Sequence, residues 1–186
     1  MTKHSDISDI DKGWFPEVRR IASPNYNGRP RGVEVDLLVL HNISLPPGDY
    51  GGDDIVSLFT NCLDCTAHSF YAELEGLEVS AHFLIRRDGE LIQFVSTEDR
   101  AWHAGVSSWC NRDNCNDFSV GIELEGCDHE PFEDAQYQTL APLIQWLRQV
   151  YPGITTGRIV GHSDIAPGRK TDPGPAFDWD RLRASV

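Results

Sequence analysis

The chain of 186 residues lacks the features that mark several large classes of proteins. No stretch approaches the roughly 18 to 20 consecutive apolar residues of a membrane-spanning helix, so we expect no membrane partner. No cluster of lysine and arginine occurs either, and 29 acidic residues against 16 basic ones give a formal charge of −13. Because phosphate binding needs a basic surface, we expect no nucleic-acid partner.

The N-terminus and the cysteines carry no signal for export or for disulfides. Residues 1–11 contain no apolar run of signal-peptide length, which predicts a cytoplasmic protein. The five cysteines are an odd set, and free thiols are the default in a reducing compartment. Cys62 and Cys65 form a lone C-x-x-C pair, whereas Cys110 and Cys115 lack the spacing that a zinc ribbon needs. We therefore expect inert, free thiols.

What the sequence does contain is an ordinary globular composition. Hydrophobic residues make up 40% and charged residues 24%, which is typical of a soluble chain that buries a core without staples. We expect one domain, residues 1–186. Within it, the polar residues 1–33 predict an extended N-terminal arm that packs on the body, with Trp14 and Phe15 as anchors.

Hydrophobic patterning predicts an α/β fold with a mixed central β-sheet of about five strands flanked by helices. The Asp88-Gly89 pair between two apolar runs indicates a β-hairpin. Asp53 is a candidate N-cap for a short helix. The predicted strands cover residues 33–40, 79–85, 91–95, 118–126 and 158–160, and the predicted helices cover 54–59, 134–151 and 177–183.

Two histidines lie in or beside predicted strands. His41 directly follows a buried strand and opens into a turn-rich loop, where a metal ligand could sit. Taken alone, a histidine in this place is more often a hydrogen-bonded residue at the edge of the core than a metal ligand. His82 falls among apolar residues, so we interpret it as a core histidine.

The strand at residues 118–126 alternates with a period of two. Its apolar set packs beneath a helix, and Glu123 and Glu125 are then on the opposite face, toward a groove. Paired glutamates can simply be solvated surface. A carboxylate that faces a metal site is also the general base that a zinc hydrolase needs.

A Pro- and Gly-rich run, residues 161–174, carries His162 and Asp172. Its composition disfavours both a helix and a central strand and predicts a rigid irregular loop. With one ligand from elsewhere, the two side chains could bind a zinc ion that keeps an open position. A polar surface loop is the alternative. Arg169 and Lys170, in the same run, are candidates for attracting an anionic substrate in an otherwise acidic chain.

Five motifs occur in the order found in a known family. They are Leu40-His41-Asn42-Ile43-Ser44, Val79-Ser80-Ala81-His82, Trp102-His103-Ala104-Gly105, Gly121-Ile122-Glu123-Leu124-Glu125-Gly126 and the run 161–174. Together they resemble the type 2 family of zinc-dependent N-acetylmuramoyl-L-alanine amidases. The resemblance extends from about Trp14 to Arg183. It implies the type 2 amidase or peptidoglycan-recognition-like fold, and cleavage of the amide bond between (1,6-anhydro-)N-acetylmuramic acid and L-alanine in muropeptides.

The resemblance also implies residue roles. Zinc would be bound by His41, His162 and Asp172. Glu123 would be the catalytic carboxylate, and Lys170 would stabilise the tetrahedral intermediate. Asn42, Trp102 and His103 would line the muropeptide cleft. Where the family can carry an arginine this chain has Asn114, and Arg112 is the candidate to replace it; Glu78 is a second departure, and both concern substrate recognition.

Two alternatives are weighed against the amidase. A non-catalytic peptidoglycan-recognition module would have lost a metal ligand or the acid/base group, and all of them are present here. A structural zinc site would need a fourth protein ligand, such as Asp164 or His103. The missing export signal favours cell-wall recycling over attack on the intact wall, with a small muropeptide as the partner and no obligate protein partner.

Overall fold

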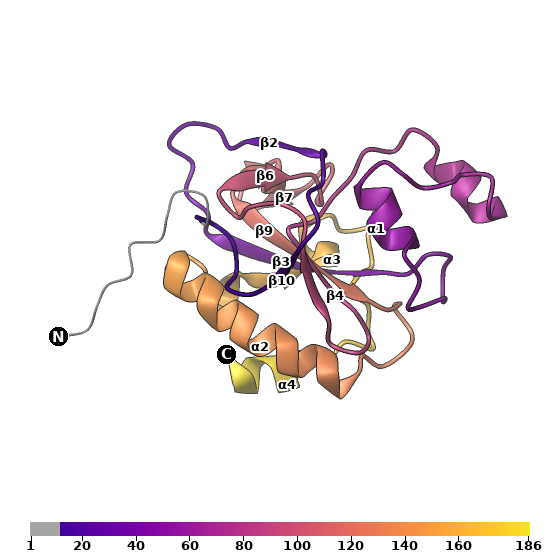
Figure 1. Ribbon diagram of the computed structural model, residues 1–186. Coiled ribbons are helices and arrows are strands. Elements are labelled where there is room, and N and C mark those ends of the chain that lie inside the picture. Colours follow the sequence, from indigo (N-terminus) through magenta and orange to yellow (C-terminus); the bar gives the residue numbers. More distant parts are fainter. Residues whose placement is uncertain (1–11) are drawn as a thin grey trace.

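A six-stranded mixed sheet lies at the centre of the computed structural model, which describes residues 12–186 (Figure 1). Residues 1–11, on which the expectation of no export signal depends, lie outside this range. The strands run in the order β1-β5-β4-β9-β3-β10. Their bounds are β1 Arg19–Arg20, β3 Leu37–Ile43, β4 Phe83–Ile85, β5 Leu91–Gln93, β9 Ser119–Glu125 and β10 Ile159–Gly161.

Strands β3 and β9 form the middle of the sheet and pair in parallel. Both are buried, and residues 37–40 have no exposed surface, as their apolar run predicts for a central strand. β10 and β4 continue the parallel pairing on either side, and β5 turns back antiparallel to β4 as the hairpin signal predicts. His41 belongs to β3 itself instead of following it.

One face of the sheet is covered by the helices α2 (Asp134–Val150) and α4 (Trp179–Ser185), which lie together below the strands in Figure 1. Val120, Ile122 and Leu124 of β9 pack there against apolar side chains of α2, which confirms the predicted alternation. α2 continues through Pro142. This layer contains the largest of the three clusters of buried apolar side chains.

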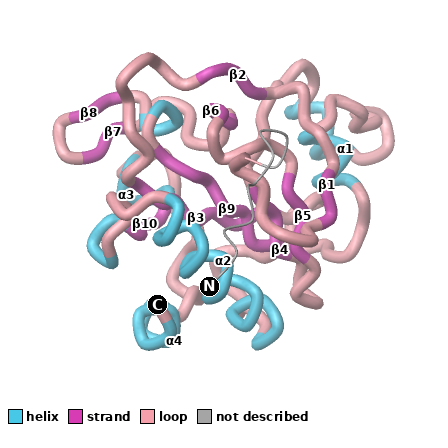
Figure 2. Tube along the Cα trace, turned by 60° about the vertical axis from the view of Figure 1, so that its left-hand side comes forward, coloured by secondary structure: helices cyan, strands magenta, loops and turns pink. Residues whose placement is uncertain are grey.

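The opposite face is covered by α1 (Asp54–Phe59), the 3₁₀ helix η2 (Ser69–Leu74) and loops. Figure 2 shows α1 at the upper right, beside β1 and well away from α2 and α4. Asp53 occupies the N-cap position of α1, but its side chain does not cap the helix because it pairs with Arg86 instead. This face is less regular, and it leaves room for a cavity.

The N-terminal arm contributes the sixth strand of this sheet, which the sequence did not predict. β1 adds to the sheet edge in parallel with β5. Phe15 packs edge-on against Trp146 of α2 with ring centroids 5.3 Å apart, and its backbone N–H donates to Gln93, so it is an anchor as predicted. A two-residue strand is too short to show periodicity, which explains the difference between five strands and six.

The other elements are short, and none of the described helices has both the length and the apolar character needed to cross a bilayer. The run 161–174, predicted to be irregular throughout, begins with a helical turn, α3 (His162–Ile165), because Asp164 accepts a hydrogen bond from the N–H of Gly161. The rest are β2 Tyr26–Gly28, β6 Asp99–Ala101, β7 Ser108–Trp109, β8 Arg112–Asp113, η3 Cys115–Asp117 and η4 Thr156–Arg158.

Candidate metal centre

Strand β3 and the segment that follows β10 bring the predicted metal ligands together. His41 in β3 is opposite Glu123 in β9, and registered side chains of parallel strands point to the same face of the sheet. β10 ends at Gly161, which pairs with Leu40, so His162 emerges beside His41. The loop after α3 then returns, and the N–H of Ser163 bonds to the carbonyl of Asp172.

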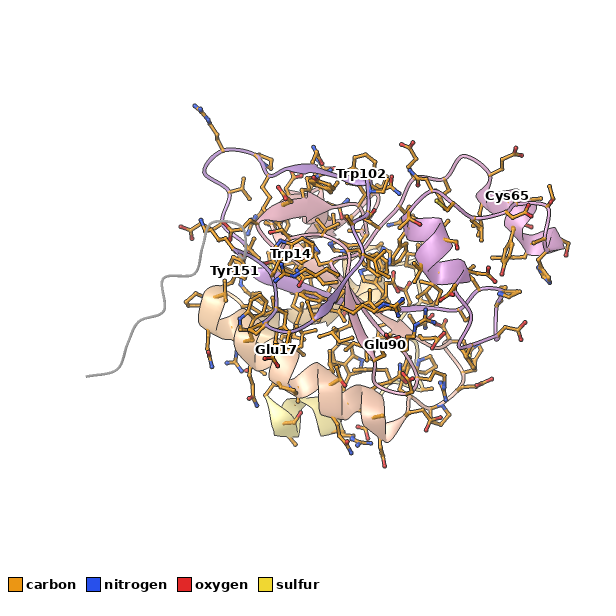
Figure 3. The ribbon with its side chains drawn as sticks, in the orientation of Figure 1. Trp14, Glu17, Cys65, Glu90, Trp102 and Tyr151 are labelled. Atoms are coloured by element: carbon orange, nitrogen blue, oxygen red, sulfur yellow. The ribbon has the colours of Figure 1, made fainter. Side chains whose placement is uncertain are left out.

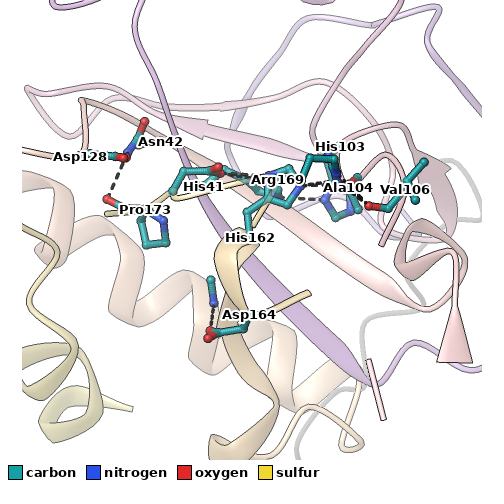
Figure 4. Close-up of polar contacts among 12 residues, drawn as sticks. His41, Asn42, His103, Ala104, Val106, Asp128, His162, Asp164, Arg169 and Pro173 are labelled. Carbon is teal, nitrogen blue, oxygen red and sulfur yellow. Dashed lines mark hydrogen bonds and ion pairs between the residues drawn. The ribbon is translucent and has the colours of Figure 1, made fainter. Parts of the chain in front are cut away.

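The three ligand atoms form a compact triangle. Nδ1 of His41 lies 2.9 Å from Nδ1 of His162, and each lies 3.1 Å from Oδ2 of Asp172. Figure 4 shows the two imidazoles side by side. Tetrahedral zinc, with ligands at about 2.0–2.1 Å, separates its ligand atoms by about 3.3 Å. A movement of a few tenths of an ångström would fit the triangle to this ion.

Hydrogen bonds on the far side of His162 support a cation at this place. Its Nε2 lies 3.0 Å from the carbonyl oxygen of Ala104, which can only accept, so Nε2 carries a proton and Nδ1 is the nitrogen that faces the triangle. Burial lowers the pKa of His41 to about 4, so this imidazole is neutral. Two imidazoles facing a carboxylate are a donor set that suits a zinc ion.

Glu123 is the unusual carboxylate of the site. It is buried, and its Oε2 atom has no hydrogen-bond partner within the described residues. Burial, followed by the nearby charge of Asp172, raises the pKa of Glu123 well above its ordinary value, and Lys170 opposes this shift. A buried carboxyl group with a raised pKa, aimed at a candidate metal site, is suited to proton transfer.

A cavity of about 540 Å³ adjoins the triangle at the ends of β3, β9 and β10. This is where parallel sheets commonly bind ligands. Its polar side includes Glu123, Lys170, His162 and Asp172. Its apolar side is made by Leu58, Phe59, Phe70, Leu74, Leu77 and Val79. The cavity therefore joins reactive groups to an extended apolar wall.

The three residues expected to line the cleft do line this cavity, but each also bonds within the protein. The indole N–H of Trp102 donates to Asn27 at 2.8 Å, and Figure 3 shows Trp102 at the upper edge of the molecule. The side chain of Asn42 donates to Asp128 and to the carbonyl of Pro173. His103 contacts His41 through a ring nitrogen, 2.9 Å away.

Other charged residues are held elsewhere. Arg112 does not line the cavity, because its guanidinium pairs with Asp36 at 2.7 Å and stacks over the ring of Phe118. Arg169 donates to the carbonyls of Ala104 and Val106. Its guanidinium therefore stabilises a loop, which differs from the predicted role of attracting an anionic substrate.

Glu125 and His82 are structural. Glu125 is buried, and its two oxygens accept the backbone N–H groups of Gly51 and Arg87. His82 is a core histidine, as predicted, and its Nδ1 accepts the N–H of Gly121. Only Glu123 of the two glutamates thus stays available for chemistry.

Several cavity residues were not expected from the sequence. Cys127, Asp128 and His129 follow β9 and line the cavity near the triangle. A polar segment directly after a central strand is the signal that could have indicated them. The apolar wall comes from α1, η2 and the loop after it, whose approach to the strand ends depends on tertiary packing that no local pattern specifies.

The alternative of a closed, four-ligand zinc site finds no support in the described residues. The metal-binding group there consists of His41, His162 and Asp172, all within 4.8 Å of one another. Asp164 is exposed and caps α3. The five cysteines are free, and Figure 3 shows Cys65 on the outlying segment at the right.

A His-His-Asp group beside a buried carboxylate and a cavity defines a candidate metallohydrolase centre on a mixed α/β sheet. Residues 31–175 match the N-acetylmuramoyl-L-alanine amidase family, and the chain belongs to this family.

Named relatives agree with this assignment. The chain is 57% identical over 176 residues to the 1,6-anhydro-N-acetylmuramyl-L-alanine amidase AmpD of Salmonella typhimurium, covering 95% of this chain and 94% of the relative. A crystal structure of a selenomethionine AmpD derivative is 56% identical, with a TM-score of 0.92 over 95% of this chain and 98% of that one. The Escherichia coli amidase AmiD, solved with anhydro-N-acetylmuramic acid-L-Ala-D-γ-Glu-L-Lys, is 30% identical, with a TM-score of 0.61 over 84% of this chain and 60% of that one.

Proposed function

We propose that this chain is a zinc-dependent amidase that hydrolyses the bond between the lactyl carbonyl of 1,6-anhydro-N-acetylmuramic acid and L-alanine in muropeptides. The observation that carries the proposal is the triangle of His41, His162 and Asp172, which adjoins a cavity that also contains Glu123. The AmpD relatives are named for this activity, and they match nearly the whole chain. The AmiD complex supports a small muropeptide as the substrate.

Each residue of the site has a defined task in this proposal. When bound, zinc supplies Lewis acidity, which lowers the pKa of a water ligand from about 16 to about 7 and polarises a carbonyl. Glu123 accepts the proton of the attacking water and transfers it to the departing amine of L-alanine, so the amide C–N bond breaks without a charged amide leaving group. The ammonium of Lys170 stabilises the negative charge that develops on the carbonyl oxygen.

Substrate binding is assigned to the cavity. Trp102 and Asn42 contact the muropeptide, and the apolar wall accepts the bicyclic anhydro sugar, which has lost two hydroxyl groups. Arg112 would need to leave Asp36 before it could meet an acidic stem peptide. We place the protein in cell-wall recycling in the cytoplasm, acting as one domain, residues 1–186.

Product analysis tests the proposal. Anhydro- and reducing-end muropeptides are incubated with the protein before and after treatment with a zinc chelator, and the products are identified by mass spectrometry. We expect free stem peptide and an intact anhydro sugar, loss of turnover after chelation, and recovery on adding zinc. Cleavage at any other bond, or full turnover in the chelated protein, would contradict the proposal.

A further inference from the structure

One short segment, residues 103–106, lies behind both histidines of the triangle. Nδ1 of His103 is 2.9 Å from Nε2 of His41, and the carbonyl of Ala104 is 3.0 Å from Nε2 of His162. Figure 4 shows this segment on the opposite side of the imidazoles from Asn42. Consecutive residues therefore contact the outer nitrogens of two ligands that come from different elements, β3 and α3.

The hydrogen-bond chain behind His103 has a determined direction. The carbonyl of Cys115 can only accept, so the hydroxyl of Ser119, 2.6 Å away, donates its single hydrogen to it. The Ser119 oxygen, 3.1 Å from Nε2 of His103, therefore accepts the proton of that nitrogen. Nδ1 of a neutral His103 then has a lone pair, which accepts Nε2–H of His41.

This series of hydrogen bonds determines which ring nitrogen of His41 is free to bind a metal. With its proton on Nε2, a neutral His41 presents the lone pair of Nδ1, and Nδ1 is the atom that belongs to the triangle. In the opposite tautomer His41 would point a proton at the centre of the triangle. Hydrogen bonds from the outer nitrogen of a histidine ligand are a general means of fixing its tautomer and ring orientation.

The position of His103 is held from several sides. The side-chain oxygen of Asn116, a buried residue, accepts the backbone N–H groups of both His103 and Ala104. The ring of His103 lies flat over Gly121, where a Cβ atom would be only 2.4 Å from the ring. Arg169 donates to the carbonyl of Ala104. His103 therefore has little freedom to move, and both of its ring nitrogens are engaged inside the protein.

We propose that His103 is a positioning residue that holds His41 ready to bind the metal through Nδ1, and that it is not a substrate contact. This inference rests on the metal site proposed above and assigns a different task to a residue that lines the same cavity. Its partners Ser119 and Asn116 belong to the same device, because they fix the proton direction and the backbone of the segment.

Zinc affinity tests the inference without relying on turnover. Competition with a chromophoric chelator is measured for the wild-type protein and for H103L and H103N. Leucine removes the acceptor for His41, and we expect zinc binding to weaken about 10- to 100-fold. Asparagine returns an oxygen near the place of Nδ1, so H103N should recover most of the affinity. The absorption spectrum of the Co²⁺-loaded protein should change in H103L and return toward wild type in H103N.

The matched control is H82N. His82 is another buried histidine, and its ring also meets that of His103 edge-on, 5.7 Å between centroids. Its ring nitrogens, however, bond to the backbone of Gly121 and Asp99 and to none of the three ligands. H82N should lose stability but keep its zinc affinity. G121A is a second probe, for use if H103L proves too unstable to study. Its methyl group displaces the His103 ring without altering the chemistry of the ring, so G121A should also weaken zinc binding.

The outcomes separate the two proposals. A wild-type protein that binds no zinc contradicts the proposed metal site. If the wild-type protein binds one zinc ion and H103L and G121A bind it equally tightly, the role of His103 is wrong. Equal weakening in H103L and H103N, or in H82N, would also overturn it, because the effect would then come from packing or general instability.

Discussion

His41 and Glu123 are opposite one another in the register of two adjacent parallel strands. The pairing of β3 with β9 thus sets the separation of a candidate ligand from the candidate base, with no flexible loop between them. A site carried by strands is held more firmly than one carried by loops. The distance between the two side chains should accordingly stay the same when either is replaced by an isosteric residue.

Replacement of Glu123 by glutamine should abolish most of the activity without releasing the metal. The amide cannot accept a proton, and general base catalysis contributes about 10²- to 10⁴-fold, so kcat should fall by that factor. Glu123 is not one of the three grouped ligands, so zinc content measured by atomic emission should stay at one ion per chain. Loss of zinc together with activity would show that the residue acts as a ligand.

Glu125, two residues further along β9, should behave in the opposite way. Both of its oxygens accept backbone N–H groups, so in E125Q an amide N–H would face one of these donors. We expect a loss of about 1–3 kcal/mol in unfolding free energy, measured by urea denaturation, with kcat reduced much less than in E123Q. An unchanged denaturation midpoint would contradict the structural role.

His82 should make the protein sensitive to acid. Burial, followed by the charge of Arg29, lowers the pKa of His82 from 6.5 to about 3 in the folded protein. Its contribution to stability is thus fully present above pH 6.5 and is lost as the pH falls toward 3, at up to about 1.4 kcal/mol per pH unit. Urea denaturation of the chelated protein between pH 4 and 7 should give a flatter pH dependence in H82N than in wild type. Parallel curves would show that another group carries the effect.

Lys170 should act on the chemical step. It lines the cavity and lies two positions before Asp172, so its ammonium is available to an oxyanion there. K170M should lower kcat by about 10²- to 10³-fold while zinc affinity stays within a few-fold of wild type. Lys12 pairs with Glu98 and does not line the cavity, so K12M is the matched control and should retain wild-type kcat. A rise in KM alone would assign Lys170 to substrate binding.

The parts of the fold that could be predicted are those with a strong local pattern. The buried strand before His41, the Asp88-Gly89 hairpin and the amphipathic helix α2 all follow from periodicity and turn chemistry. β1 and α3 could not be predicted in this way. β1 exists because the arm reaches an open sheet edge, and α3 forms because Asp164 bonds to a neighbouring N–H in a run whose composition disfavours a helix.

The site shows the same division between local and tertiary information. Residue types make His41, His162 and Asp172 candidates, the resemblance to the amidase family selects them as a set, and the structure brings these three together. The surroundings depend on side-chain partners from distant segments. Arg112 bonds to Asp36 and Arg169 bonds to the loop carbonyls, and neither contact leaves a trace in the local sequence. Residue types thus indicate which side chains can take part in the chemistry, but they do not indicate which side chains from distant segments bond to them.

His41 and Asp172 are separated by 131 positions, and every other group of the centre comes from a further segment between them. No fragment of the chain contains a usable binding site, so the ion cannot nucleate folding as it does in a zinc finger. The chain must instead fold first, which brings the two histidine nitrogens and the carboxylate of Asp172 together. The ion then binds to a preformed site. Bound zinc should consequently raise the melting temperature by mass action, in proportion to the logarithm of its free concentration.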